Sequence, residues 1–168
     1  MKEKGLHPKN NFNKGYDFDA LILVNPLLKE FVAKNQFDTV TIDFSNPEAV
    51  RELNKALLFS FEKISSWNFP AKNLCPPIPG RLDYIHYLAD LLSSEENIKI
   101  LDIGTGATAI YPLLGIATYN WNFVATDIDI DSLDVAQDIM DDNKFDSKIE
   151  LRQQLKEEQI LAKVAEGE

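Results

Sequence analysis

The sequence has one cysteine, two histidines and no long apolar run. The single cysteine, Cys75, excludes an intrachain disulfide and a zinc site built from several cysteines. No stretch approaches the roughly 18 uninterrupted apolar residues that a membrane helix requires, and the polar amino terminus has no signal-peptide core. We therefore expect a cytoplasmic protein with no membrane partner and no metal centre. A chain of 168 residues has the usual size of one domain, with or without an attached arm.

Positive charge is also scarce. There are 17 Lys and Arg against 27 Asp and Glu, which gives a net charge of −10 and argues at first sight against a nucleic-acid partner. The acidity is unevenly spread, because residues 126–168 contain 13 acidic and 5 basic side chains, a net of −8. Residues 1–20 contain four lysines and three acids, a net of +1. The net charge of the whole chain therefore does not exclude binding of nucleic acid by the amino-terminal residues.

The first half of the chain predicts an arm followed by a small α+β module. Apolar residues at helical spacing predict the helices, alternation predicts the strand, and three closely spaced prolines predict the extended loop. Ser45 or Asn46 followed by Pro47 and Glu48 is typical of a helix start. The expected elements are an irregular arm (1–16), a helix interrupted or restarted at Pro26 (17–35), a strand (39–44), a helix (45–63), a proline-rich loop (67–80) and a helix (81–94).

The second half predicts the start of a parallel α/β sheet. Residues 98–103 form a mostly apolar run, four of six, which we interpret as a strand covered on both faces. The expected continuation is a glycine turn (104–106), a short helix, a strand (122–126), an acidic helix (132–142) and a third strand (148–152).

The most informative segment is the turn that contains Asp102, Gly104 and Gly106 at the end of the first of these strands. Glycines there let a ligand approach the backbone closely, and the amino terminus of the next helix supplies a positive potential. A second acid, Asp127, closes the next strand 21 residues after Gly106. An acid at that place in a nucleotide-binding α/β fold can accept hydrogen bonds from ribose hydroxyls. The alternative is that these residues only form tight turns.

Two cofactors compete for this turn. Gly104, Gly106 and Ala109 match the loose dinucleotide fingerprint, which favours NAD and an oxidoreductase. Asp102, however, would face a pyrophosphate with like charge, whereas it suits the cationic ammonium or sulfonium of S-adenosylmethionine. The residues therefore favour S-adenosylmethionine.

Several segments, in order along almost the whole chain, resemble the bacterial 23S ribosomal RNA adenine methyltransferase family, whose eukaryotic relatives methylate adenine in small nuclear and messenger RNA hairpins. The segments that carry the resemblance are Leu6-His-Pro-Lys-Asn10, Tyr16-Asp-Phe18, Thr41-Ile-Asp-Phe-Ser-Asn-Pro-Glu-Ala-Val50, Leu74-Cys-Pro-Pro-Ile-Pro-Gly-Arg-Leu-Asp-Tyr-Ile-His86, Leu101-Asp-Ile-Gly-Thr-Gly-Ala107 and Ile110-Tyr-Pro-Leu113.

The resemblance implies a class I, Rossmann-like S-adenosylmethionine methyltransferase fold with an N-terminal α+β module, and transfer of a methyl group to the 6-amino group of an adenine. It divides the chain into an RNA-binding arm (1–16), an accessory module (17–80) and the first half of the methyltransferase domain (81–168). It implies cofactor contacts by Arg81, Asp102, Gly104, Gly106 and Asp127. It implies RNA contacts in the arm by Lys2, Lys4, His7, Lys9, Asn10 and Lys14, side chains that offer charge or hydrogen bonds to phosphates and bases.

One departure from the family pattern is important. The catalytic Asn-Pro-Pro-Phe motif, which follows a fourth strand in the family and holds the target amine, does not occur in this sequence. We expect a fold truncated after its third strand, inactive by itself, although a helical stretch over 153–165 could instead partly cover the open sheet edge. A non-catalytic RNA-binding or regulatory fragment is an alternative to an enzyme.

Other candidate residues have simpler interpretations. His86 lies between apolar residues of a helix, and Cys75 precedes prolines without a visible catalytic partner, so both are expected to be structural. The run of aspartates within residues 127–138 resembles a calcium-binding loop, but this segment lacks the glycine and the glutamate that such a loop requires. Trp67, Trp121 and Tyr111 could stack on a base, but packing is the default expectation for them.

Overall fold

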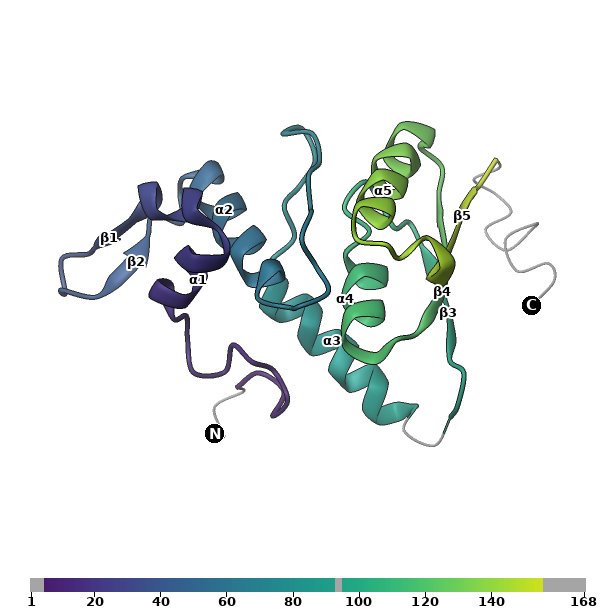
Figure 1. Ribbon diagram of the computed structural model, residues 1–168, viewed down its shortest axis with the longest axis horizontal. Coiled ribbons are helices and arrows are strands. Elements are labelled where there is room, and N and C mark those ends of the chain that lie inside the picture. The colour runs from purple at the N-terminus through teal and green to yellow at the C-terminus, as the bar shows by residue number, and fades with distance from the viewer. Residues whose placement is uncertain (1–4, 93–94, 156–168) are drawn as a thin grey trace.

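The computed structural model describes residues 5–92 and 95–155 of the chain. A helical module with a small hairpin, drawn in purple and blue in Figure 1, is joined through a long helix to a three-stranded sheet with its own helices. The helices and strands are α1 (Phe18–Val24), η1 (Pro26–Phe31), β1 (Val32–Lys34), β2 (Val40–Ile42), α2 (Pro47–Phe59), α3 (Ile78–Leu91), β3 (Lys99–Ile103), α4 (Ile110–Tyr119), β4 (Asn122–Asp127), α5 (Ile130–Asp142), η2 (Asp146–Lys148) and β5 (Ile149–Gln153).

The segment expected as one helix over 17–35 is divided into three elements. The helix α1 ends at Val24 with Asn25 as its C-cap, and Pro26 starts the 3-10 helix η1, as the interruption at proline predicted. The last part of the expectation was wrong, because β1 follows and pairs antiparallel with β2. The side chain of Asn35 accepts hydrogen bonds from the backbone nitrogens of Phe37 and Thr39 and so builds the hairpin turn. This turn chemistry outweighs the helical spacing of the apolar residues.

Helix α2 starts where the sequence predicted. The side chain of Asn46 accepts hydrogen bonds from the backbone nitrogens of Glu48 and Ala49, and Pro47 occupies the first turn, where its missing N–H costs nothing. The helix ends at Phe59 rather than near residue 63. Its buried apolar side chains belong to the main apolar core and are Ala49, Leu53, Ala56, Leu57 and Leu58.

Helix α3 starts three residues earlier than expected, inside the proline-rich segment. Pro79 lies in its first turn, and the side chain of Asn54 on α2 accepts a hydrogen bond of 3.0 Å from the backbone nitrogen of Ile78. A proline in the first turn is compatible with a helix because the first N–H groups have no intrahelical partner. The division expected between residues 80 and 81 therefore falls within α3.

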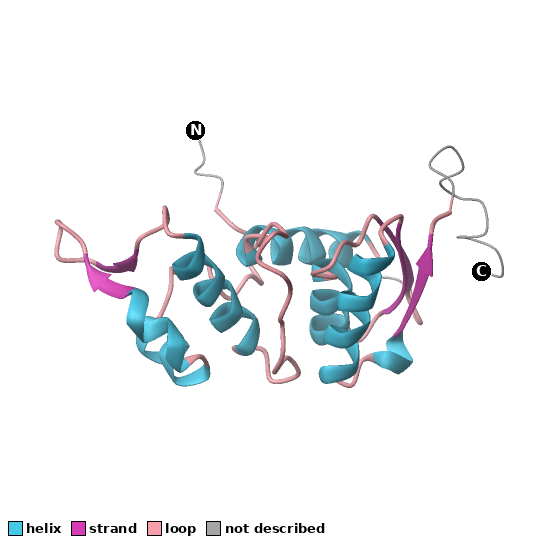
Figure 2. Ribbon diagram, turned by 90° about the horizontal axis from the view of Figure 1, so that it is seen from above, coloured by secondary structure: helices cyan, strands magenta, loops and turns pink. Residues whose placement is uncertain are grey.

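The sheet has the strand order β3-β4-β5, and both pairs are parallel, as predicted. Figure 2 shows the helices α3, α4 and α5 on one side of this sheet. The central strand β4 is almost wholly buried. The expectation that residues 98–103 are covered on both faces was wrong for the described residues, because β3 is an edge strand and Leu101 and Ile103 are 37% and 47% exposed.

The long loop between α2 and α3 is fastened to the sheet domain at two places. The indole nitrogen of Trp67, which is fully buried, donates to the carbonyl oxygen of Thr108 at 3.0 Å. The side chain of Asn143, just after α5, accepts from the backbone nitrogen of Ser65 and donates to the carbonyl oxygen of Ser66. Trp67 is therefore a core residue and not a surface for stacking. These contacts fix the loop against the segment that leads into α4.

Candidate cofactor site

The turn between β3 and α4 has a backbone that only glycine adopts without strain. Gly104 and Gly106 have φ angles of +77° and +62°. An added Cβ at either position would meet no atom of the described residues within 4 Å, so this part of the chain leaves space beside both glycines. The backbone nitrogens of Gly104 and Thr105 both donate to the carbonyl oxygen of Thr126, which fixes the turn to the end of β4. The turn can thus admit a ligand close to its backbone.

Asp127 lies at the end of β4 and touches this turn. Its Oδ2 atom accepts a hydrogen bond of 2.8 Å from the backbone nitrogen of Gly106, and its Oδ1 atom accepts one of 3.0 Å from the backbone nitrogen of Asp129. Each oxygen of an ionised carboxylate has a second lone pair, so both oxygens can still accept from a ligand hydroxyl. Asp127 shapes the turn and keeps acceptor capacity beside it.

The carboxyl group of Asp102 is the unusual group of the site. Its Oδ2 atom is buried and has no hydrogen-bond partner among the described residues. Burial raises the pKa of Asp102 above its ordinary value; the side chain of Thr105 acts against this shift, and the nearby charge of Asp127 adds to it. A buried carboxylate without a partner is costly, and a cationic ligand would supply the missing partner. Asp102 is therefore poised to receive a cation.

A cavity of about 340 Å³ lies beside this carboxylate. Its lining includes Asp102, Tyr84 on α3 and Tyr111 on α4. The two rings are tilted against each other with centroids 5.1 Å apart. The remaining lining is apolar and consists of Ile85, Leu88, Ile100, Leu101 and Phe123.

Arg81, in the first turns of α3, reaches the same region. Its Nη1 atom donates to the hydroxyl oxygen of Tyr111 at 3.1 Å, and its guanidinium carbon is 5.6 Å from the centre of the Tyr111 ring. Through Tyr111, which lines the cavity together with Asp102, the structure connects Arg81 to Asp102, although the two residues are 21 positions apart in the sequence. Sequence reasoning considered Tyr111 only for stacking on a base. Its place in the first turn after the glycines was the signal that it belongs to the site.

The amino-terminal arm lies on α3. The backbone nitrogen of His7 donates to Asp83 at 2.8 Å, and its Nε2 atom is 2.9 Å from Asp90. The side-chain nitrogen of Asn10 donates to Asp83 at 2.7 Å and to the carbonyl oxygen of Pro79 at 2.9 Å. Both side chains are only 3% exposed. The expected RNA contacts of His7 and Asn10 do not fit this placement, because their polar atoms already hold the arm on α3.

The lysines of the arm are placed differently. Lys9 and Lys14 are exposed, and the ammonium group of Lys9 forms an ion pair with Asp90 at 2.8 Å. This surface pair leaves the ammonium in contact with solvent. Lys2 and Lys4 lie outside the described residues, and so does most of the helical stretch expected over 153–165.

His86 and Cys75 have surroundings that suit structural residues. The His86 ring is 4% exposed, stacks on His7 with centroids 5.1 Å apart, and has its Nδ1 atom 2.7 Å from the Tyr119 hydroxyl. Burial raises the pKa of the Cys75 thiol, which disfavours the reactive thiolate. Among the residues that the structure describes, no three His, Cys, Asp or Glu side chains gather as a set of metal ligands. No helix of the described part is long and apolar enough to cross a membrane.

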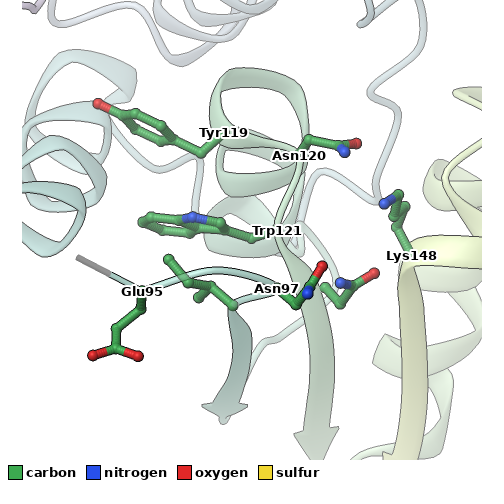
Figure 3. A pocket seen from close by; sticks show the side chains of 8 residues that line it. Glu95, Asn97, Tyr119, Asn120, Trp121 and Lys148 are labelled. Carbon is green, nitrogen blue, oxygen red and sulfur yellow. The ribbon is translucent and has the colours of Figure 1, made fainter. Parts of the chain in front are cut away.

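A second pocket, shown in Figure 3, lies at the opposite end of the sheet. Its volume is about 240 Å³, and it opens beside the residues that precede or begin β3, β4 and β5. Ligands of open α/β sheets bind at the carboxyl ends of the strands, where the glycine turn is. The asparagines of this pocket also have a local explanation, because Asn97 and Asn120 have φ angles of +55° and +57°, a conformation that asparagine tolerates. The pocket is therefore not the candidate cofactor site.

Comparison with known proteins places these features in a wider group. A sequence profile described as RNA methyltransferase matches residues 1–168. The chain is 51% identical over 170 residues to ribosomal RNA large subunit methyltransferase F of Shewanella denitrificans, with 97% of this chain and 47% of that protein covered. It is 45% identical over 173 residues to the protein of the same name from Pseudomonas fluorescens, with 98% and 51% covered. The chain thus spans about half the length of these curated relatives.

Solved structures agree with the fold. The chain matches the methyltransferase domain of METTL16 with a TM-score of 0.87 and 33% identity over 99% of this chain and 67% of that one. It matches the N-terminal domain of human METTL16 in complex with SAH with a TM-score of 0.83 and 33% identity, covering 92% and 61%. It matches the METTL16 catalytic domain in complex with a MAT2A 3′UTR hairpin with a TM-score of 0.81 and 35% identity, covering 91% and 55%. The expected class I methyltransferase fold is confirmed.

Proposed function

This chain belongs to the RNA methyltransferase family, and from that membership we propose that it carries the cofactor-binding part of an enzyme that methylates the 6-amino group of an adenine in 23S ribosomal RNA. The proposed methyl donor is S-adenosylmethionine, which when bound supplies an electrophilic methyl group on a sulfonium. The names of the curated relatives support the substrate class, and the METTL16 complex with SAH supports the cofactor class. We propose a cytoplasmic location, in keeping with that substrate.

One observation carries the choice of cofactor. The buried Oδ2 atom of Asp102 has no hydrogen-bond partner among the described residues, and the Arg81 guanidinium donates to the hydroxyl of Tyr111, which lines the same cavity as Asp102. The amino-acid end of S-adenosylmethionine has an ammonium group and a carboxylate. Asp102 would hold the ammonium, and Arg81 would hold the carboxylate with its paired N–H donors. A dinucleotide offers phosphates to this turn, and these would meet the Asp102 carboxylate with like charge.

The other site residues would bind the nucleoside end of the cofactor. Asp127 would accept hydrogen bonds from the ribose hydroxyls with the lone pairs that Gly106 and Asp129 leave free. Gly104 and Gly106 would let the cofactor approach the backbone, since no described residue fills the space beside them. These residues bind and orient the cofactor. The residues that hold the adenine are not assigned, because the Asn-Pro-Pro-Phe motif is absent from the sequence.

Lys9 and Lys14, together with Lys2 and Lys4, are proposed to bind RNA phosphates from the arm. They are lysines on a segment with a local net positive charge, whereas His7 and Asn10 are proposed to fix that segment to α3. Phosphate contacts of this kind position an RNA without reading its sequence.

The test has a binding step and a transfer step. Calorimetric titration of the chain with S-adenosylhomocysteine should show saturable binding, and titration with NAD should not. The product of the complete reading frame should then transfer a tritiated methyl group to adenine of unmodified ribosomal RNA. Binding of NAD alone would overturn the cofactor assignment. Binding of RNA by the complete product without any methyl transfer would instead support the non-catalytic alternative.

A further inference from the structure

The Arg81 guanidinium is held by a neutral group. Its one side-chain hydrogen bond in the described part of the chain is the 3.1 Å contact with the Tyr111 hydroxyl, and no carboxylate of the described residues lies within ion-pair distance of it. Arg51 is likewise bound by neutral groups, the carbonyl oxygens of Phe69 and Pro70, whereas Arg152 forms an ion pair with Glu150. Arg81 is therefore oriented without being neutralised.

Tyr111 is well placed to give that orientation. It lies in the first turn of α4, directly after the glycine turn, and it is half-buried. Its ring packs against Tyr84 of α3, and the Arg81 guanidinium carbon lies 5.6 Å from its ring centre. An aromatic ring has only two rotatable side-chain bonds, so this packing fixes the hydroxyl oxygen with little loss of entropy. The contact also joins the helix that carries Arg81 to the helix that begins at the cofactor turn.

We infer that Tyr111 is a positioning residue, which holds the Arg81 guanidinium toward the carboxylate end of the cofactor; this inference rests on the proposed function. The hydroxyl oxygen accepts one N–H of the guanidinium and leaves the other donors for a carboxylate. Without the hydroxyl, Arg81 would have to be ordered when the ligand binds, and that ordering would weaken binding.

The test compares Tyr111→Phe with Tyr87→Phe. Both variants lose one phenolic hydroxyl, but the exposed Tyr87 hydroxyl has no hydrogen-bond partner among the described residues and lies outside the cavity. Two ligands are titrated by calorimetry: S-adenosylhomocysteine, which has the amino-acid end, and 5′-methylthioadenosine, which lacks it. Tyr111→Phe should bind S-adenosylhomocysteine about three- to tenfold more weakly than the wild type, the range expected for one hydrogen bond. It should bind 5′-methylthioadenosine as the wild type does, and Tyr87→Phe should be unchanged with both ligands.

A second measurement needs no ligand. Relaxation of the ¹⁵N-labelled Arg81 Nε–H group should report an ordered side chain in the wild type and in Tyr87→Phe, and a mobile one in Tyr111→Phe. Thermal unfolding of each variant checks that the fold is retained. Equal loss of affinity for both ligands, or an equally ordered Arg81 in Tyr111→Phe, would overturn the positioning role. If the wild type binds S-adenosylhomocysteine and Tyr111→Phe binds it equally well, only this inference fails. If the wild type does not bind it, the proposed cofactor site fails as well.

Discussion

The backbone nitrogen of Gly106 donates a 2.8 Å hydrogen bond to the Asp127 carboxylate, so the glycine turn after β3 is fixed to the end of β4. The same carboxylate accepts from the backbone nitrogen of Asp129, where α5 begins. One side chain thus connects three consecutive parts of the sheet domain. The residue expected to bind a ribose is also a support of the turn that would receive the cofactor.

Replacing Asp127 should therefore affect both stability and binding. Asp127→Ala leaves two backbone nitrogens without their acceptor and should lower the free energy of unfolding by about 1–3 kcal/mol. Asp127→Asn keeps one acceptor oxygen and should lose less stability, while both variants should bind S-adenosylhomocysteine more weakly. Urea denaturation and calorimetry measure the two effects. Asp138→Ala, at an exposed position on α5, is the control and should change neither. An Asp127→Ala variant as stable as this control would contradict the supporting role.

The sequence was sufficient to place Asp102, Gly104, Gly106 and Asp127 together. Strand ends of a parallel sheet meet at one edge, so two adjacent strands and their turns fix the position of these residues by local spacing alone. The parallel α/β sheet was predicted from the same pattern and is present in the structure. The class I methyltransferase fold was predicted from the family resemblance, and the comparisons confirm it.

The roles of residues whose contacts are distant in the sequence were harder to predict. The family resemblance implied RNA contacts for His7 and Asn10, whose side chains offer hydrogen bonds to phosphates and bases. The structure brings them onto α3, where Asp83 lies 76 positions after His7 and 73 after Asn10. Nothing local in the sequence marks such a docking. The link between Arg81 and Tyr111 across 30 positions was missed for the same reason.

Replacing Asp102 should change stability and ligand affinity in opposite directions. Its raised pKa means that the folded protein favours the protonated form, so the ionised carboxylate at neutral pH costs folding free energy. Asp102→Asn removes that charge and should raise the free energy of unfolding at pH 7. The same variant should bind S-adenosylhomocysteine much more weakly. A loss of stability in Asp102→Asn would contradict the account.

Proton release should accompany ligand binding at the same carboxyl group. A ligand ammonium favours the ionised form of Asp102 and lowers its pKa, so binding in the range of the raised pKa expels a proton. Affinity should then increase as the pH rises through that range and level off above it. Calorimetry in buffers with different ionisation enthalpies measures the protons released. The Asp102→Asn variant is the control, since it should show no such release.

Gly115 on α4 leaves no room for a larger residue. A Cβ atom at this position would lie 2.5 Å from an atom of the buried Phe123 ring and 3.2 Å from Trp121. Gly115→Ala should therefore lower the free energy of unfolding by about 1–3 kcal/mol, even though alanine is the better helix former. Phe123→Leu in the same chain should recover part of that loss, because it removes the clashing ring edge. Strictly additive effects of the two substitutions in urea denaturation would contradict a direct clash.

The lysines of the arm should contribute affinity for RNA without sequence preference. Lys14→Glu should weaken binding of RNA hairpins and reduce the slope of the logarithm of affinity against the logarithm of salt concentration by about 1. The control is Lys29→Glu, which reverses an exposed lysine of η1 and changes net charge equally. Filter binding at several salt concentrations measures both. Equal effects of the two variants would mean that net charge, and not the arm, determines the affinity.

The stability of the fold should depend on pH through His86, whose ring stacks on His7 of the docked arm. Burial lowers the pKa of His86, and the charges of His7 and Lys9 lower it further, while Asp83 and Asp90 act in the opposite direction. Because the folded pKa lies below the unfolded one, the contribution of His86 to stability is present above the unfolded pKa and is lost as the pH falls through the folded value. The free energy of unfolding should decrease on acidification below about pH 6.5, the ordinary pKa of histidine. His86→Gln cannot take up that proton and should show a smaller decrease, measured by urea denaturation at several pH values. A wild-type profile with the same slope as His86→Gln would show that protonation of another group causes the loss.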